Sequence, residues 1–190
     1  LAAQSGSSNT LSWENGLLLE PWKVDCPDEI SIPGDRSLEA FAKLYAALHS
    51  VELEVSNRPD DVDALGAEVL DDDSLDLRDA NDLLPPLAAL LALGDGGTIT
   101  GAAHARHKES NRIERTVELL AAFGLEASAT EDGVKVGGNQ SPEAPKEMVR
   151  THADHRLWMT AACLSSKVGG ELDNPGMHAV TDPDFMSRIA

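Results

Sequence analysis

Apolar positions recur every three or four residues in several stretches of the chain, and this spacing predicts amphipathic helices. In the stretch 38–48 the apolar face is formed by Phe41, Leu44, Tyr45 and Leu48. Further helices are predicted over 83–93, 112–123, 155–167 and a short stretch after Pro183. Glycines follow most of these stretches, as expected where a helix ends.

Short runs with strand character lie between the predicted helices. Segment 51–55 alternates apolar residues with glutamates, and 126–130 and 134–136 flank Asp132-Gly133, a hairpin signal. Other extended or short elements are expected at 17–19, 29–32, 98–100 and 171–172, with a helical piece near 62–65. The order predicts an α/β (α+β) fold. Residues 1–10 are small and polar and are expected to be a disordered leader, with one domain over 11–190.

Composition narrows the classes of partner. The 190 residues carry 33 acidic against 15 basic side chains, a formal charge of −18, which argues against nucleic acid or an anionic membrane as partner. No apolar run approaches the roughly 20 residues that cross a bilayer, and no signal peptide is visible, so we expect a cytoplasmic protein. Cys26 and Cys163 follow no metal-ligand spacing.

Cations are scarce, yet four of the fifteen fall between positions 106 and 115. Asn111 and Glu114 form a plausible capping box for the helix 112–123, whose free N–H groups would attract an anion. Arg112 then lies in the first turn, where a cation is unfavourable unless something negative offsets it. His104, Arg106 and His107 add further donors. The alternative is a solvated turn in which Arg112 pairs with Glu109 or Glu114.

A second helix opening repeats this arrangement. Asp154 is a good N-cap, and His155 and Arg156 follow it at the start of an almost wholly apolar helix. Arg156 could instead pair with Asp154, and the histidines at 152 and 155 are weak evidence for a metal site. Asp82 precedes another apolar helix, either as its cap (a role open to Asn81 as well) or as a carboxylate aimed at a substrate hydroxyl.

These residues resemble a family pattern. The stretch from Lys108 to Ile113 is close to Lys-Glu-Ser/Thr-Asp-Arg-Ile, and Asp154-His155-Arg156 matches a second motif, of the C-terminal half of 5-enolpyruvylshikimate-3-phosphate (EPSP) synthases. The same order is kept by Asp82, Gly34-Asp35-Arg36-Ser37 and Pro183-Asp184-Phe185.

The resemblance implies repeated βαβαββ units, one lobe of an inside-out α/β barrel. It implies transfer of the enolpyruvyl group of phosphoenolpyruvate to the 5-hydroxyl of shikimate 3-phosphate, a step of aromatic amino acid biosynthesis, with no metal or organic cofactor. By position, Asp82, Lys108 and Glu109 would be catalytic. The substrate-binding set that the resemblance implies is Asp82, His104, Lys108, Arg112, His155 and Arg156.

The chain departs from that pattern in several places. Val180 stands where a basic residue is expected, Asn111 replaces an aspartate, and 51–74 is short and acidic. The N-terminal half of the family pattern, with its own substrate ligands, is absent, so the resemblance implies that this chain needs a partner lobe for activity. Two alternatives stay open: the related transferase that acts on a UDP-amino sugar, and a non-catalytic lobe that keeps the anion pocket.

Overall fold

The computed structural model describes residues 23, 25, 27–29, 34–55 and 75–189. One compact unit spans Gly34–Ala190, and it contains nearly all the described residues; the other spans Leu1–Pro33. The predicted strands 17–19 and 29–32 and the helical piece near 62–65 lie wholly or largely outside the described residues. The division into a leader over 1–10 and a domain over 11–190 stays a prediction.

Helices are the main regular elements described in the unit Gly34–Ala190, as the periodicity predicted. The α-helices are α1 (Glu39–His49), α2 (Leu84–Leu93), α3 (Arg112–Ala122), α4 (His155–Val168) and α5 (Phe185–Ile189). The short 3-10 turns are η2 (Arg36–Leu38), η5 (Asn81–Leu83), η6 (Ala103–His107) and η7 (Met177–Val180). All five predicted helices are therefore confirmed to within one or two residues.

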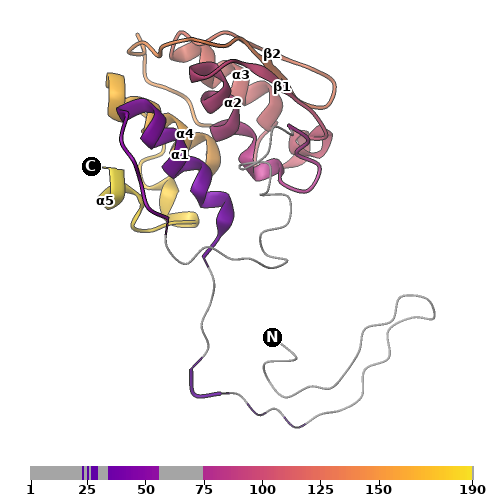
Figure 1. Ribbon diagram of the computed structural model, residues 1–190, viewed down its shortest axis with the longest axis vertical. Helices are drawn as coiled ribbons and strands as arrows, with labels where there is room; N and C mark the ends of the chain where they lie inside the picture. Colours follow the sequence, from indigo (N-terminus) through magenta and orange to yellow (C-terminus); the bar gives the residue numbers. More distant parts are fainter. Residues whose placement is uncertain (1–22, 24, 26, 30–33, 56–74, 190) are drawn as a thin grey trace, which may run out of the picture. The chain divides into compact units, whose positions relative to one another are not determined.

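The core lies where α1, α2, α3 and α4 meet. Helix α2 is buried on nearly all sides because its sequence is almost entirely Leu, Ala and Pro, and its two prolines fall in the first turn, where no helical N–H is lost. Helix α4 is buried from His155 through Leu164. Figure 1 shows α1 and α4 side by side. The polar starts of α3 and α4 are thereby carried to the edge of an apolar core.

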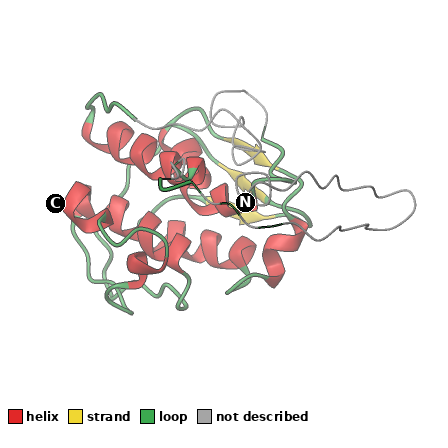
Figure 2. Ribbon diagram, turned by 90° about the horizontal axis from the view of Figure 1, so that it is seen from below, coloured by secondary structure: helices red, strands yellow, loops and turns green. Residues whose placement is uncertain are grey.

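Three short strands form an antiparallel sheet in the order β1-β3-β2. The strands are β1 (Gly97–Ile99), β2 (Ala127–Ala129) and β3 (Val134–Val136). In β3 the two valines are buried and Lys135 is exposed, which is the alternation of a sheet with one covered face. Figure 2 shows the strands grouped together beside the helices. The predicted hairpin and the strand near 98–100 are confirmed.

Two strand predictions are corrected. Segment 51–55 forms no strand, and its side chains Val51, Leu53 and Val55 are 41–48% exposed. An alternating pattern becomes a strand only when a neighbouring strand supplies the hydrogen-bond ladder, and none of the described residues pairs with this segment. Near 171–172 there is only a single bridge, between Leu172 and Val149.

Asn81 and Asp82 do not cap α2, contrary to the prediction. The turn η5 precedes α2, and the N-cap of α2 is Leu83. Neither Asn81 nor Asp82 accepts a hydrogen bond from a backbone N–H of the helix. Both side chains are engaged elsewhere, Asn81 with His104 and Asp82 with cations. Gly124, in contrast, ends α3 as predicted, with the left-handed φ of 73° that glycine adopts without strain.

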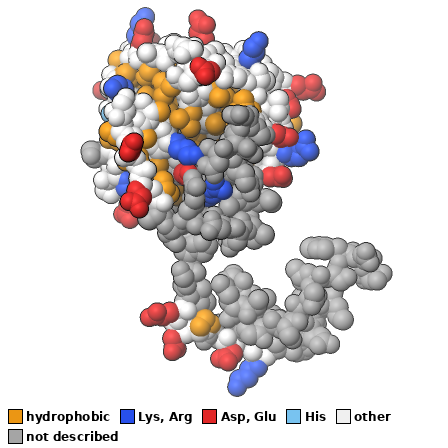
Figure 3. Space-filling view, in the orientation of Figure 1, with side chains coloured by type: hydrophobic (Ala, Val, Ile, Leu, Met, Phe, Trp, Pro, Cys, Tyr) orange, Lys and Arg blue, Asp and Glu red, His pale blue; other side chains and the backbone are white. Residues whose placement is uncertain are grey.

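Apolar side chains gather in the middle of the face shown in Figure 3, with charged side chains mostly around them. No helix among the described residues is long and apolar enough to span a membrane.

Candidate functional site

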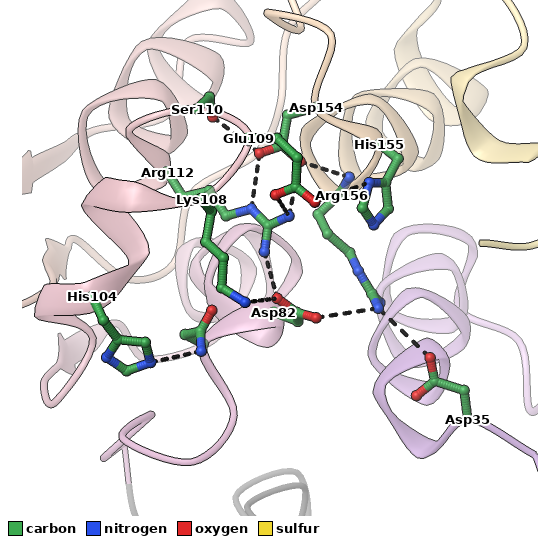
Figure 4. Close-up of polar contacts among 11 residues, drawn as sticks. Asp35, Asp82, His104, Lys108, Glu109, Ser110, Arg112, Asp154, His155 and Arg156 are labelled. Carbon is green, nitrogen blue, oxygen red and sulfur yellow. Dashed lines mark hydrogen bonds and ion pairs between the residues drawn. The ribbon is translucent and has the colours of Figure 1, made fainter. Parts of the chain in front are cut away.

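Cations from two separate helix openings meet at one carboxylate, Asp82 (Figure 4). Arg112 from the start of α3 donates from Nη1 to Asp82 Oδ1 at 2.5 Å. Arg156 from the start of α4 brings Nη2 to 3.5 Å from Asp82 Oδ2, and Lys108 places Nζ 3.6 Å from Oδ1. The helix 112–123 and the helix after Asp154 therefore converge on a single cluster, as their sequences suggested.

Arg112 is enclosed by acidic side chains. Its side chain is 1% exposed, and it donates from Nε to Asp154 Oδ2 at 2.8 Å and from Nη2 to Glu109 Oε2 at 2.6 Å, in addition to Asp82. The pairing with Glu109 was one predicted alternative, but the arginine is buried rather than solvated. Burial alone would lower the pKa of Arg112, and its hydrogen bond and charge pairing with Asp154, helped by Asp82 and Glu109, raise it instead. Arg112 is thus a fixed positive charge.

Asp154 holds both helix openings together. Its carboxylate is fully buried, caps α4 by accepting from the N–H of Arg156 at 2.9 Å, and accepts from Arg112 and from Ser110 Oγ at 3.0 Å. The sequence identified Asp154 as a cap but not as the partner of Arg112. The sequence could have indicated that Asp154 is buried and paired, because it caps a helix that is too apolar to be exposed. In α3, Asn111 Oδ1 accepts from the N–H of Glu114 at 3.4 Å, which confirms the Asn111 half of the predicted capping box. The carboxylate of Glu114 accepts from Arg106 Nη1 at 3.1 Å.

Arg156 is bound much less tightly than Arg112. The residue is 4% exposed, yet its Nε and Nη1 atoms are buried without a hydrogen-bond partner among the described residues. Its contacts are ion pairs from Nη2 to Asp82 and, at 3.6 Å, to Asp35 Oδ2, both longer than a good hydrogen bond. The predicted alternative, a guanidinium paired with Asp154, is wrong, because Asp154 binds only the backbone N–H of Arg156.

Buried donors without partners are costly, and a charged one more so. Arg156 is therefore the buried cation of this cluster that still has donors left for an outside anion. Asp35, which sequence analysis noted only within the Gly-Asp-x-Ser resemblance, contributes the other carboxylate beside it. Asp35 also caps η2 by accepting from the N–H of Ser37 at 2.9 Å, which fixes its position.

Titration of the cluster follows from its charges. Burial would raise the pKa of Asp82, but the positive charges of Arg156, Arg112 and Lys108 outweigh burial and lower it below its ordinary value. Asp82 is thus ionised at neutral pH. The pKa of His155 is lowered, mainly by burial and also by the charge of Arg156, so its imidazole is neutral at neutral pH. His155 Nδ1 lies 3.8 Å from Glu109 Oε1.

The other expected donors lie outside this cluster. His104 is exposed, and its Nε2 is 2.6 Å from Asn81 Nδ2. Arg106 donates to the carbonyl oxygens of Thr130 and Glu131 in the hairpin turn, so it anchors the loop rather than facing Asp82. The substrate-binding role implied for His104 stays a prediction.

The cluster is close to electrically balanced. Four carboxylates (Asp35, Asp82, Glu109, Asp154) face three cations (Lys108, Arg112, Arg156). Among the described residues, no group of three or more His, Cys, Asp or Glu side chains is placed to hold a metal ion. Of the two histidines in the weak metal pattern, His152 instead pairs with Glu118 at 3.3 Å.

Known proteins are similar to this chain in sequence and in fold. The sequence model of the EPSP synthase (3-phosphoshikimate 1-carboxyvinyltransferase) family matches residues 27–189. The chain is similar to the 3-phosphoshikimate 1-carboxyvinyltransferase of Methanocorpusculum labreanum, with 32% identity over 93% of this chain and 47% of that protein. It is also similar to that of Methanosphaera stadtmanae, with 29% identity over 88% of this chain and 45% of the relative.

A solved structure agrees at the level of fold. The structure of EPSP synthase from Acinetobacter baumannii superposes with a TM-score of 0.69 at 20% identity, over 95% of this chain and 51% of that one. The fold is therefore mixed α/β and corresponds to half of a longer chain. The protein spans about half the length of the curated relatives that it matches.

Proposed function

The chain belongs to the EPSP synthase family, and we propose that it forms half of a site that moves the enolpyruvyl group of phosphoenolpyruvate to the 5-hydroxyl of shikimate 3-phosphate. The observation that carries the proposal is Arg156, a buried guanidinium with Nε and Nη1 unpaired among the described residues, beside an ionised Asp82. The phosphate or carboxylate group of phosphoenolpyruvate would supply the acceptors that Arg156 lacks.

The roles of the other residues follow from the reaction. The 5-hydroxyl oxygen bonds to C2 of phosphoenolpyruvate and loses its proton, which an ionised Asp82 is suited to receive. The methylene carbon C3 gains a proton at the same stage. The proposed donor is Glu109, which projects into the cluster and must first take up a proton, because a carboxylate paired with Arg112 has none to give. Loss of phosphate from C2, with removal of a proton from C3, then restores the double bond.

Fixed charges would stabilise the reacting groups. Protonation at C3 leaves C2 electron-poor, which a neighbouring carboxylate stabilises, and phosphate departs as an anion, which preorganised cations stabilise. Lys108 is 38% exposed and lies beside Asp82, and its proposed role is to contact an incoming anionic substrate. His155 is the neutral neighbour of Arg156, and His104 lies at the Asn81 side of the cluster.

The charge balance argues for a partner lobe. Phosphoenolpyruvate and shikimate 3-phosphate are both multiply charged anions, and four carboxylates already face the three cations of this cluster. We therefore propose that further cations come from a second lobe. The two lobes would form the inside-out α/β barrel of βαβαββ units that the resemblance implies. The reaction would belong to cytoplasmic aromatic amino acid biosynthesis.

Binding is the first test. We would titrate the chain with phosphoenolpyruvate and with inorganic phosphate by calorimetry, and compare Arg156→Gln with Arg115→Gln, which removes an exposed arginine of α3 outside the cluster. The proposal expects measurable binding that is lost in Arg156→Gln and kept in Arg115→Gln. Equal binding by both variants would place the anion elsewhere.

Turnover is the second test. Phosphate release would be followed with both substrates, for the chain alone and mixed with the separately produced N-terminal half of the Methanocorpusculum labreanum relative. Release only in the mixture supports the proposal. Anion binding without release supports a non-catalytic lobe. Release with UDP-N-acetylglucosamine in place of shikimate 3-phosphate would instead support the transferase that acts on that sugar.

A further inference from the structure

An aromatic ring lies against the guanidinium of Arg156. Cζ of Arg156 is 6.0 Å from the ring centroid of Phe41, a residue of α1 that is 2% exposed. This distance is at the outer edge of the range over which a guanidinium is attracted to the face of an aromatic ring. Because α1 and α4 pack side by side (Figure 1), the contact joins the first helix of the unit to the start of α4.

The ring matters because little else holds Arg156 in place. Its two ion pairs, 3.5 Å to Asp82 and 3.6 Å to Asp35, are too long to fix the plane of the guanidinium by hydrogen bonding. Its Nε and Nη1 have no partner among the described residues. The flat face of Phe41 both restricts the guanidinium plane and keeps water from one side, so an anion would meet an ordered, weakly screened cation.

Phe41 is itself supported by the closing motif of the chain. Its ring meets the ring of Phe185 edge to face, with centroids 5.9 Å apart and an interplanar angle of 76°. This is a favoured geometry for an aromatic pair. Phe185 begins α5, directly after Pro183-Asp184, and is 4% exposed. The Pro-Asp-Phe motif is thus connected to Arg156 only indirectly: Phe185 contacts Phe41, and Phe41 contacts the guanidinium.

We propose that Phe41 is a positioning residue for Arg156, and that Phe185 supports it. The ring presents the guanidinium with its free N–H groups toward an incoming carboxylate or phosphate. This inference rests on the proposed function, since it assumes that Arg156 binds the anion. It predicts that loss of the ring weakens anion binding beyond what the loss of core stability alone would cause.

The test compares three substitutions in the full chain, with inorganic phosphate and phosphoenolpyruvate as probes in calorimetry. Phe41→Leu keeps an apolar side chain but removes the ring. Phe41→Tyr keeps the ring, and its hydroxyl has room because Phe41 borders a groove of about 280 Å³ between α1 and α5. Phe123→Leu removes a fully buried ring for which no cation–π contact is found among the described residues, and it serves as the packing control.

We expect Phe41→Leu to weaken binding of both probes about three- to tenfold, the range typical of a partly desolvated cation–π contact. Phe41→Tyr should bind within about twofold of the unsubstituted chain. Phe123→Leu should lower stability as Phe41→Leu does, but leave the affinity unchanged. Phe185→Leu should weaken binding in the same direction by less, and it tests the idea independently if Phe41→Leu does not fold.

Three results would contradict the inference, and they can be told apart. If the unsubstituted chain binds and Phe41→Leu and Phe185→Leu bind equally well, Phe41 is only a packing residue and the proposed function stands. If Phe123→Leu weakens binding as much as Phe41→Leu, the effect is a general loss of core order, which also refutes it. If the unsubstituted chain binds neither probe, the proposed function fails, and this inference fails with it.

Discussion

The fully buried carboxylate of Asp154 offers the sharpest test of how the cluster is built. In Asp154→Asn the side chain keeps its size and an oxygen that can accept the N–H of Arg156, and Asn caps helices about as well as Asp. The substitution therefore keeps the cap but removes the negative charge that faces Arg112, and it puts an NH2 donor in place of Oδ2, which accepts from Arg112 Nε at 2.8 Å and from Ser110 Oγ. Asp154→Ala removes that charge and the cap together.

The expected magnitude follows from burial. Arg112 is 1% exposed, so it cannot turn to water when its partner is lost, and breaking a buried ion pair from one side costs about 3–5 kcal/mol. Asp82 and Glu109 still contact the guanidinium, which places Asp154→Asn at the lower end, about 3 kcal/mol. Asp154→Ala should cost about 1 kcal/mol more, because the cap is lost as well.

Urea unfolding followed by circular dichroism measures these losses through the linear dependence of the free energy of unfolding on urea. The matched control is Glu118→Gln, which removes the charge of an exposed carboxylate that pairs with Arg115, and should cost less than about 1 kcal/mol. A loss in Asp154→Asn no larger than in Glu118→Gln would show that Arg112 does not depend on this carboxylate, and the account of the cluster would be wrong.

Three further predictions concern the same unit. Ala153 has a left-handed φ of 54° next to the cap of α4, so Ala153→Gly should raise the free energy of unfolding by up to about 1 kcal/mol. Ala47→Gly, on the exposed face of α1, should lower that free energy by about as much. If urea unfolding shows that both substitutions change it in the same direction, the backbone at Ala153 is not strained. The pKa of His155 in the folded chain lies below its ordinary 6.5, so the unfolded chain takes up the proton at higher pH and stability should fall as the pH drops below about 6.5. His155→Gln should reduce this dependence of stability on pH. If the dependence is unchanged in the variant, another group causes it. With a formal charge of −18, the chain should become more stable between about 0.1 M and about 1 M KCl, as the Debye length falls from about 10 to about 3 Å, and a melting temperature that does not rise would contradict this.

The sequence was sufficient for the helices but only partly sufficient for the strands, for a physical reason: β1, β2 and β3 were predicted, but so was 51–55, which forms no strand. A helix such as α3 satisfies its own backbone, so a cap at Asn111, an apolar stripe and Gly124 define it locally. A strand depends on a partner that can lie anywhere in the chain. Segment 51–55 has the alternation of a strand but no ladder among the described residues, while β3 has two neighbours and forms.

The site was predictable in its membership more than in its connections. Both arginines were singled out because a cation in the first turn of a helix needs a compensating negative charge. The sequence did not show that this compensation differs so much between them. Asp154 is 42 residues from Arg112, and Asp35 is farther still from Arg156, so neither pairing has a local signature.

That difference between the two arginines decides what the cluster can do. Arg112 already donates to three carboxylates, so it can stabilise charge at a distance. It can bind an anion directly only if Asp82 or Glu109 gives up its hydrogen bond to the guanidinium. Arg156 has two donors unpaired among the described residues, Nε and Nη1, that no carboxylate has to release, although an anion reaches these buried atoms only when neighbouring side chains move aside. Binding should therefore begin at Arg156. A substrate hydroxyl that engages Asp82 would then compete with Arg112 for the same carboxylate, and this would release an N–H of Arg112 toward the ligand only once both substrates are present.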